Sequence, residues 1–146
     1  MNRLETISKI LSAKFVASSL EQQRKASIVA CELAFHSINL EIPYVLESLE
    51  QLRLDGKLTQ ERIAELNELS TQYDEKYFTI EDKAEDGLGL QAESIRLFSY
   101  ARAIAALSLA GEEDILVSAT ECIYEASMVF DNSSDFFTKI EETLAT

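Results

Sequence analysis

The chain has few of the residues that interrupt helices. Its 146 residues include four glycines, one proline and no tryptophan. Glycine and proline end helices and shape the turns of sheets, so their scarcity favours long helices joined by short connections. Hydrophobic residues make up 47 % of the chain, which is more than disordered chains contain. We therefore expect a single folded domain over residues 1–146.

Residues that bind metals are also scarce. His36 is the only histidine, and Cys31 and Cys122 are the only cysteines. A di-iron bundle needs two Glu-x-x-His motifs, and a structural zinc site needs four Cys or His ligands, so neither is expected. The catalytic and phosphate-binding motifs HExxH, GxSxG, GxxxxGK[ST] and GxGxxG are absent. We expect no metal, no cofactor and no enzymatic activity, and interpret both cysteines as reduced thiols in the core.

Long apolar runs are missing from the sequence. No stretch of 18 apolar residues occurs, so no membrane-spanning helix is expected. The first residues, MNRLETISKILSAKF, place charges between the apolar side chains, unlike the core of a signal peptide. Arg3, Lys9 and Lys14 could help this segment to dock on a membrane, but three basic residues favour packing against the core. We expect a cytoplasmic protein that makes no membrane contact.

Positively charged residues are also few. The chain has thirteen Lys and Arg residues and 26 Asp and Glu residues, so its net charge is −13. Residues 1–40 hold five basic and three acidic residues, so the acidity belongs to the rest of the chain. Such a surface repels nucleic acid and attracts basic proteins, so we expect a basic protein partner and no nucleic acid. The simpler alternative is that the acidity only keeps the protein in solution.

One stretch is apolar around nearly its whole helical circumference. It is LQAESIRLFSYARAIAALSLA, residues 90–110, and its only charged residues are Glu93, Arg96 and Arg102. A helix that is apolar on all sides is usually buried by its neighbours. We therefore predict an all-α bundle of six or seven helices around a buried central helix at about 90–110.

The other helices follow from apolar spacing and from capping residues. We predict them at about residues 2–17, 19–40, 43–55, 59–77, 112–130 and 135–144. The first presents one apolar stripe, formed by Leu4, Ile7, Leu11 and Phe15. Ser19 and Gln22 have capping-box spacing. Pro43 suits a first helical turn, and Thr79 is expected to break or re-cap the helix that precedes it.

The segment YDEKYFTIEDKAEDGLG combines aromatic residues with a high density of acids. Tyrosines and paired charges supply much of the energy at protein interfaces. We predict a partner-binding site in residues 73–86, with two tyrosine anchors and five carboxylates as charge partners: Tyr73, Tyr77, Asp74, Glu75, Asp82, Glu85 and Asp86. The pattern leaves open whether this segment is a helix or a loop.

About a third of the chain carries a resemblance to a known class of proteins. The block SIRLFSYARAIAALSLAG, followed by DILVSATECIYEASMVFDNSSDFF, is rich in Ala and Leu at helical spacing. It resembles the late helices of all-α immunity proteins from bacterial polymorphic-toxin and contact-dependent inhibition systems. The resemblance implies tight binding and neutralisation of a toxin, such as a basic nuclease, without catalysis. It carries over no binding residues and does not identify the toxin.

Two other functions stay open. One is a helical enzyme or small-ligand binder, with Glu93, Arg96, Arg102 or His36 lining a pocket; Glu32, four residues before His36, could form an acid–base pair with it or only a surface contact. The other is a regulatory or scaffold protein with constitutive partners. The sequence does not decide between a monomer and a homodimer.

Overall fold

The computed structural model describes residues 2–83 and 91–146, and all regular structure in these ranges is α-helical. The described chain contains eight helices in this order: α1 (Arg3–Ile7), α2 (Lys9–Ala17), α3 (Leu20–Ile38), α4 (Pro43–Asp55), α5 (Gln60–Lys83), α6 (Gln91–Ala110), α7 (Ile115–Ser127) and α8 (Ser134–Leu144). The predicted all-α class is confirmed. The predicted count of six or seven is too low, because the first predicted helix is divided in two.

Ser8 makes this division. Its backbone is extended, with φ −155° and ψ 98°, and its hydroxyl accepts a hydrogen bond from the Leu11 N–H at 3.1 Å as the N-cap of α2. Leu11 and Phe15 are buried, as the predicted apolar stripe requires. Ile7 was predicted on the same stripe but is exposed, because the extended residue interrupts the helical register.

The predicted boundaries of α3 and α4 are confirmed by their caps. The Ser19 hydroxyl accepts from the Gln22 N–H at 3.1 Å, and the Gln22 side chain accepts from the Ser19 N–H at 3.0 Å. Pro43 is the first residue of α4, where its missing N–H costs nothing. Gly56 ends that helix at φ +75°, a conformation that glycine adopts without steric cost.

The expected break at Thr79 is wrong. The Thr79 hydroxyl donates to the Glu75 carbonyl at 2.9 Å, and a threonine can make this bond inside a continuous helix. α5 therefore extends to Lys83, and residues 73–83 are helical. Glu85 and Asp86 lie outside the described residues.

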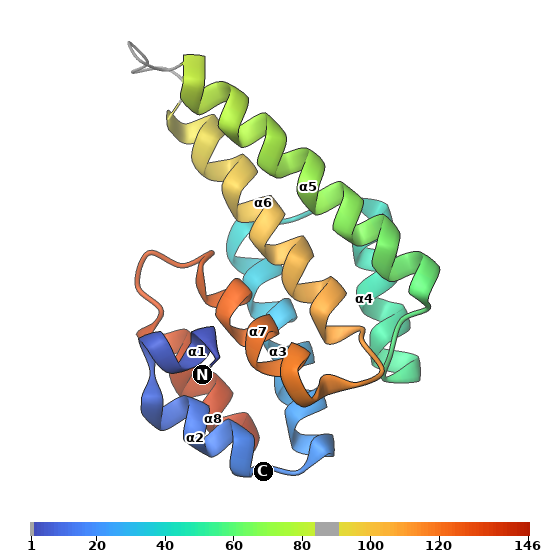
Figure 1. The fold of residues 1–146 in the computed structure, drawn as a ribbon, viewed down its shortest axis with the longest axis vertical. Coiled ribbons are helices and arrows are strands. Elements are labelled where there is room, and N and C mark those ends of the chain that lie inside the picture. The colour runs from blue at the N-terminus through green and yellow to red at the C-terminus, as the bar shows by residue number, and fades with distance from the viewer. Residues whose placement is uncertain (1, 84–90) are drawn as a thin grey trace.

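The core lies between α3, α6 and α7, which pack against one another. Helices α1, α2 and α8 gather at one end of the molecule, and α4 lies on the opposite side of α3 (Figure 1). The largest fully buried side chains include Phe15, Leu66, Ile104, Leu107 and Ile123, from four different helices. The C-terminal half of α6 is thus central, as predicted.

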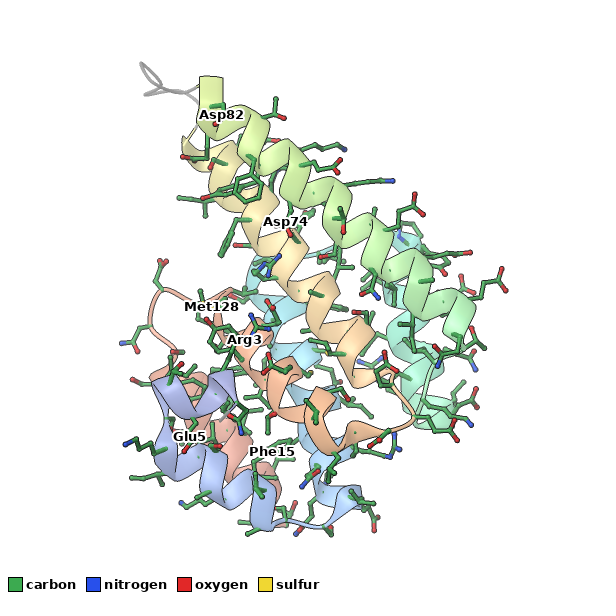
Figure 2. All side chains as sticks on the ribbon, viewed as in Figure 1. Arg3, Glu5, Phe15, Asp74, Asp82 and Met128 are labelled. Atoms are coloured by element: carbon green, nitrogen blue, oxygen red, sulfur yellow. The ribbon has the colours of Figure 1, made fainter. Side chains whose placement is uncertain are left out.

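The other half of α6 leaves the body of the molecule. Residues 91–98 of α6 pack beside residues 72–83 of α5, and the two segments project beyond the other helices (Figure 1). We call this projection the helical arm. Asp82 lies close to its tip, and both chain termini lie at the far end of the molecule (Figure 2). Ile95, on α6 in the arm, is 56 % exposed, so the predicted burial of the central helix does not extend to its first turns.

A close backbone contact joins the segment that precedes α5 to the end of α6. The Leu58 N–H, just before α5, donates to the Gly111 carbonyl at the end of α6 at 2.9 Å. A Cβ on Gly111 would lie 2.6–2.8 Å from three side-chain carbons of Leu58, so only glycine permits this approach. No helix in the described chain is long and apolar enough to cross a membrane.

Candidate protein-binding site on the helical arm

The outward face of α5 is a row of carboxylates. Seven exposed residues at spacings of three and four occupy this face, and five of them are acidic: Glu61, Glu65, Glu68, Gln72, Glu75, Thr79 and Asp82. Residues three and four apart are neighbours on a helix surface, so the seven form one continuous stripe. At 1.5 Å per residue the stripe is about 32 Å long. We call it the acidic stripe.

Among the side chains that the structure describes, none supplies a counter-charge to the acidic stripe. None of its five carboxylates forms an ion pair with a cation in the described part of the chain. Two basic residues next to the stripe in sequence are engaged elsewhere: Arg62 pairs with Glu47 of α4 at 3.3 Å, and Lys76 lies 5.2 Å from the ring of Tyr73. Unneutralised charges on one face create a negative potential that extends into solvent.

The structure divides the predicted binding residues between two faces of α5. Glu75 and Asp82 lie on the acidic stripe. Tyr73 and Tyr77 face α6 instead, with Tyr73 in an edge contact with Tyr100 at 5.5 Å. Burial and Tyr100 raise the pKa of Tyr73, so its phenol stays neutral at physiological pH.

Tyr77 packs between two phenylalanines. Its ring lies 5.5 Å from Phe98 of α6 and 5.2 Å from Phe78. Both predicted tyrosine anchors are therefore half-buried in the α5–α6 interface, where they hold the two helices of the arm together. Phe78, which sequence reasoning did not select, is the exposed aromatic residue of this group.

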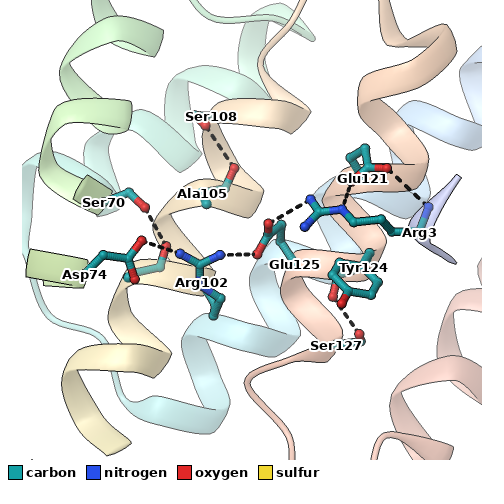
Figure 3. Close-up of polar contacts among 11 residues, drawn as sticks. Arg3, Ser70, Asp74, Arg102, Ala105, Ser108, Glu121, Tyr124, Glu125 and Ser127 are labelled. Atoms are coloured by element: carbon teal, nitrogen blue, oxygen red, sulfur yellow. Dashed lines mark hydrogen bonds and ion pairs between the residues drawn. The ribbon is translucent and has the colours of Figure 1, made fainter. Parts of the chain in front are cut away.

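Asp74, another predicted charge partner, belongs to an internal ion network. Its carboxylate accepts from the Arg102 guanidinium at 2.5 Å, and the same guanidinium donates to Glu125 at 2.8 Å. Glu125 also accepts from Arg3 at 2.9 Å, so the network runs from α5 through α6 and α7 to α1 (Figure 3). Its charges are paired with one another, although the buried Nε of Arg102 has no hydrogen-bond partner in the described chain. We interpret the network as the clamp that fixes the base of the arm to the body.

Burial dominates the electrostatics of this clamp at Asp74. Partial desolvation raises the pKa of the Asp74 carboxyl above its ordinary value, and the opposing attraction of Arg102 is the smaller effect. Glu125 is the most buried member, with a side chain only 7 % exposed. A buried carboxylate held by two arginines supports folding rather than reaction with a ligand.

A groove runs along one side of the arm. Its volume is about 650 Å³, and it is lined by residues of both helices: Gln72, Tyr73, Glu75, Lys76, Thr79, Ile80, Glu93, Arg96 and Leu97. Glu93 and Arg96, two of the candidate ligand-binding residues, pair with each other at its edge at 2.7 Å. The other two candidates lie elsewhere: Arg102 belongs to the clamp, and His36 is exposed on α3.

The remaining candidates for chemistry are engaged in structural contacts. Glu32, the possible partner of His36, pairs with Arg53 of α4 at 2.8 Å. Cys31 and Cys122 come together in the core with their sulfurs 4.0 Å apart, and the neighbouring thiol and burial raise the pKa of Cys31. Within residues 2–83 and 91–146, no group of three His, Cys, Asp or Glu residues is placed to hold a metal ion.

Sequence reasoning missed three stripe residues, Glu61, Glu65 and Glu68. They were missed because the binding segment was chosen by the density of acids along the chain. Their spacing of four and three residues, continued by Glu75 and Asp82, was the available signal. The predicted helix at 59–77 already contained Glu61, Glu65, Glu68 and Glu75, and only Asp82 lay beyond the expected break at Thr79.

Comparison with protein-family models, with curated proteins and with solved structures finds no match to this chain. Its function is therefore argued from its own geometry and charge.

Proposed function

We infer that the chain is an acidic protein-binding module that captures a basic protein through the acidic stripe of α5. The observation that carries this proposal is that no described cation pairs with the carboxylates of the stripe, in contrast to the paired acids of the clamp. Complementary charge accelerates association and selects basic partners over acidic ones. Because the part of the stripe from Gln72 to Asp82 lies on the projecting arm, a large partner can reach that part without contact with the body of the molecule (Figure 1).

The kind of partner follows from the resemblance to immunity proteins. We propose that the chain is a cytoplasmic inhibitor that neutralises a basic toxin, such as a nuclease domain, by covering its surface. In this role the chain performs no reaction of its own. A nuclease surface that binds nucleic acid is basic, so it is complementary to the stripe.

The test compares two variants that lose the same charge. The stripe variant carries Glu61→Gln, Glu68→Gln, Glu75→Gln and Asp82→Asn. The matched control neutralises four exposed acids outside the arm: Glu21→Gln, Glu41→Gln, Asp131→Asn and Glu142→Gln. Each set includes one glutamate from the first turn of its helix, so both lose a similar interaction with the helix dipole.

The readout is capture of proteins from the source cell's lysate, followed by assay of the captured protein. We expect the wild type and the control variant to capture one basic protein, to inhibit it at a 1:1 ratio and to release it in high salt. The stripe variant should lose this capture. If both variants behave alike, or if the captured protein stays fully active, the proposal is wrong.

A second candidate function is a self-associating scaffold. It is favoured by the exposed apolar side chains of Ile10 and Val16 on α2, in the least acidic part of the chain. Sedimentation of the wild type and of an Ile10→Ser, Val16→Ser variant tests it. A dimer that dissociates in the variant would support the scaffold, whereas a wild-type monomer would rule it out.

A further inference from the structure

One face of α6 is covered by α7 in the body of the molecule but not in the arm. Arg102 faces α7, because its guanidinium bonds to Glu125. Phe98 and Ile95 lie four and seven residues before Arg102, so they continue the same face of α6 toward the tip of the arm. α7 ends at Ser127, and there this face is left uncovered: Phe98 is partly exposed and Ile95 is 56 % exposed.

α5 extends this apolar surface with an aromatic side chain. Phe78 is 61 % exposed and contacts Tyr77, which in turn contacts Phe98. Single exposed apolar residues are ordinary, but neighbouring ones on two packed helices form a patch that marks interaction sites. We call Phe78, Phe98 and Ile95 the apolar shelf.

The shelf borders the acidic stripe directly. Glu75, Phe78 and Asp82 follow at spacings of three and four, so the exposed ring lies between two carboxylates that pair with no described cation. A second copy of this chain is a poor occupant, because docking two shelves would bring two acidic stripes together. Charge complementarity instead requires an occupant that is basic beside its apolar side chains.

We propose that the apolar shelf and the acidic stripe together bind one amphipathic, basic helix of the partner protein. Its Lys and Arg residues lie along the stripe, and its apolar edge packs on Phe78 and Ile95. A single exposed charge pair contributes little to affinity, although several charges acting together contribute more, whereas a buried aromatic or aliphatic contact slows dissociation. The stripe therefore sets the rate of encounter and the shelf sets the lifetime of the complex. This proposal rests on the proposed function, since it specifies how the same arm holds its partner.

Two synthetic helical peptides of about 21 residues, the length of the stripe, serve as probes. Both carry Lys at every third or fourth position on one face. The first has Leu along the neighbouring edge, and the second has Ala there, which preserves helix propensity. Fluorescence anisotropy measures the affinity of each peptide for the full chain at low and high salt.

The matched variants remove exposed apolar side chains inside and outside the shelf. The shelf variant is Phe78→Gln with Ile95→Gln, and the control is Ile10→Gln with Leu116→Gln, whose side chains are at least as exposed. All four positions are exposed on helices, so both variants are expected to fold, and circular dichroism verifies this.

We expect the Leu peptide to bind at least about tenfold more tightly than the Ala peptide, and to dissociate more slowly. The shelf variant should abolish this difference while its affinity for the Ala peptide stays unchanged, and the control variant should preserve the difference. If the two peptides bind equally, or if their difference in affinity survives in the shelf variant, the proposed role of the apolar shelf is wrong. If neither peptide binds, the proposed function of the stripe is overturned as well, so the two failures are distinguishable.

Discussion

The carboxylate of Glu125 on α7 accepts a hydrogen bond from the guanidinium of Arg102 on α6 at 2.8 Å, in an almost fully buried position. Its second oxygen accepts from Arg3 at 2.9 Å. Glu125 is thus the centre of the clamp, because it links the helix that carries the arm to the N-terminal helix α1.

Replacing Glu125 by Gln should destabilise the fold. The change removes the negative charge that compensates two arginines, and Arg102 is mostly buried. Loss of one member of a buried ion pair is costly, but the half-exposed Arg3 side chain stays hydrated and limits this cost. We therefore expect the free energy of unfolding to fall by about 2 kcal/mol. Urea unfolding measures the loss, with exposed Glu142→Gln as the control that should change stability by less than about 0.5 kcal/mol. If Glu125→Gln lowers stability no more than Glu142→Gln does, the interpretation of this network as a clamp is wrong.

Asp74 should give the stability of the protein an unusual dependence on pH. Burial raises its pKa in the folded state, so folding favours the protonated form. The stabilisation from this group is complete below its unfolded pKa of about 3.8 and is lost as the pH rises through the higher folded value. Asp74→Asn imitates the protonated form at every pH.

The stability of the Asp74→Asn variant relative to the wild type should therefore increase as the pH rises from about 3 to neutrality. Urea unfolding at a series of pH values measures this difference. A decrease over the same range would mean that the ion pair with Arg102 outweighs the cost of burial.

Gly111→Ala should destabilise the contact between the end of α6 and the residue that precedes α5. The new Cβ would overlap three carbons of Leu58, including its Cβ, so the backbone must move and not only a flexible side-chain end. We expect a loss of about 1–3 kcal/mol, as for other overpacked sites.

A double-mutant cycle with Leu58→Ala checks the cause of the Gly111→Ala effect. Removing the Leu58 side chain eliminates most of the clash, so the double variant should be more stable than the sum of the single changes implies. Thermal or urea unfolding of the four proteins measures the coupling. Strict additivity would show that the loss arises elsewhere.

The arm should open more readily than the body. The buried core cluster includes Ile63 and Leu66 of α5 and begins in α6 at Ala103, so the distal halves of both helices lack its support. Amide hydrogen exchange is expected to be at least about tenfold faster in residues 72–82 than in the buried turns of α3. Mass spectrometry of proteolytic fragments makes the comparison, and equal protection would show that the arm unfolds only with the whole molecule.

The fold class was predictable because it depends on local patterns. The scarcity of glycine and proline, the capping box at Ser19 and the apolar spacing identified most helices. Ser8 was missed because a serine within a helical pattern is compatible with both a continuous helix and a new N-cap. Thr79 was misjudged for the related reason that its hydroxyl can bond inside the helix as well as end it.

The candidate site was predictable only in part. The sequence directed attention to residues 73–86, and Glu75 and Asp82 from that segment lie on the acidic stripe. It could not separate them from Asp74, because adjacent residues point to different faces of a helix and the partner of Asp74, Arg102, is 28 residues away. The exposed position of Ile95 depends on where α7 ends, which no local pattern near Ile95 records.

The sequence by itself therefore determined the helices, the excess of negative charge and the absence of metal-binding and catalytic motifs, because these depend on composition and on spacings within about four residues. Only the tertiary structure decided which acids are paired and which are free, and which half of α6 is buried. These properties depend on contacts between helices that are distant in sequence, such as those of Arg3 with Glu125 and of Leu58 with Gly111, and only the packing of the whole chain creates them.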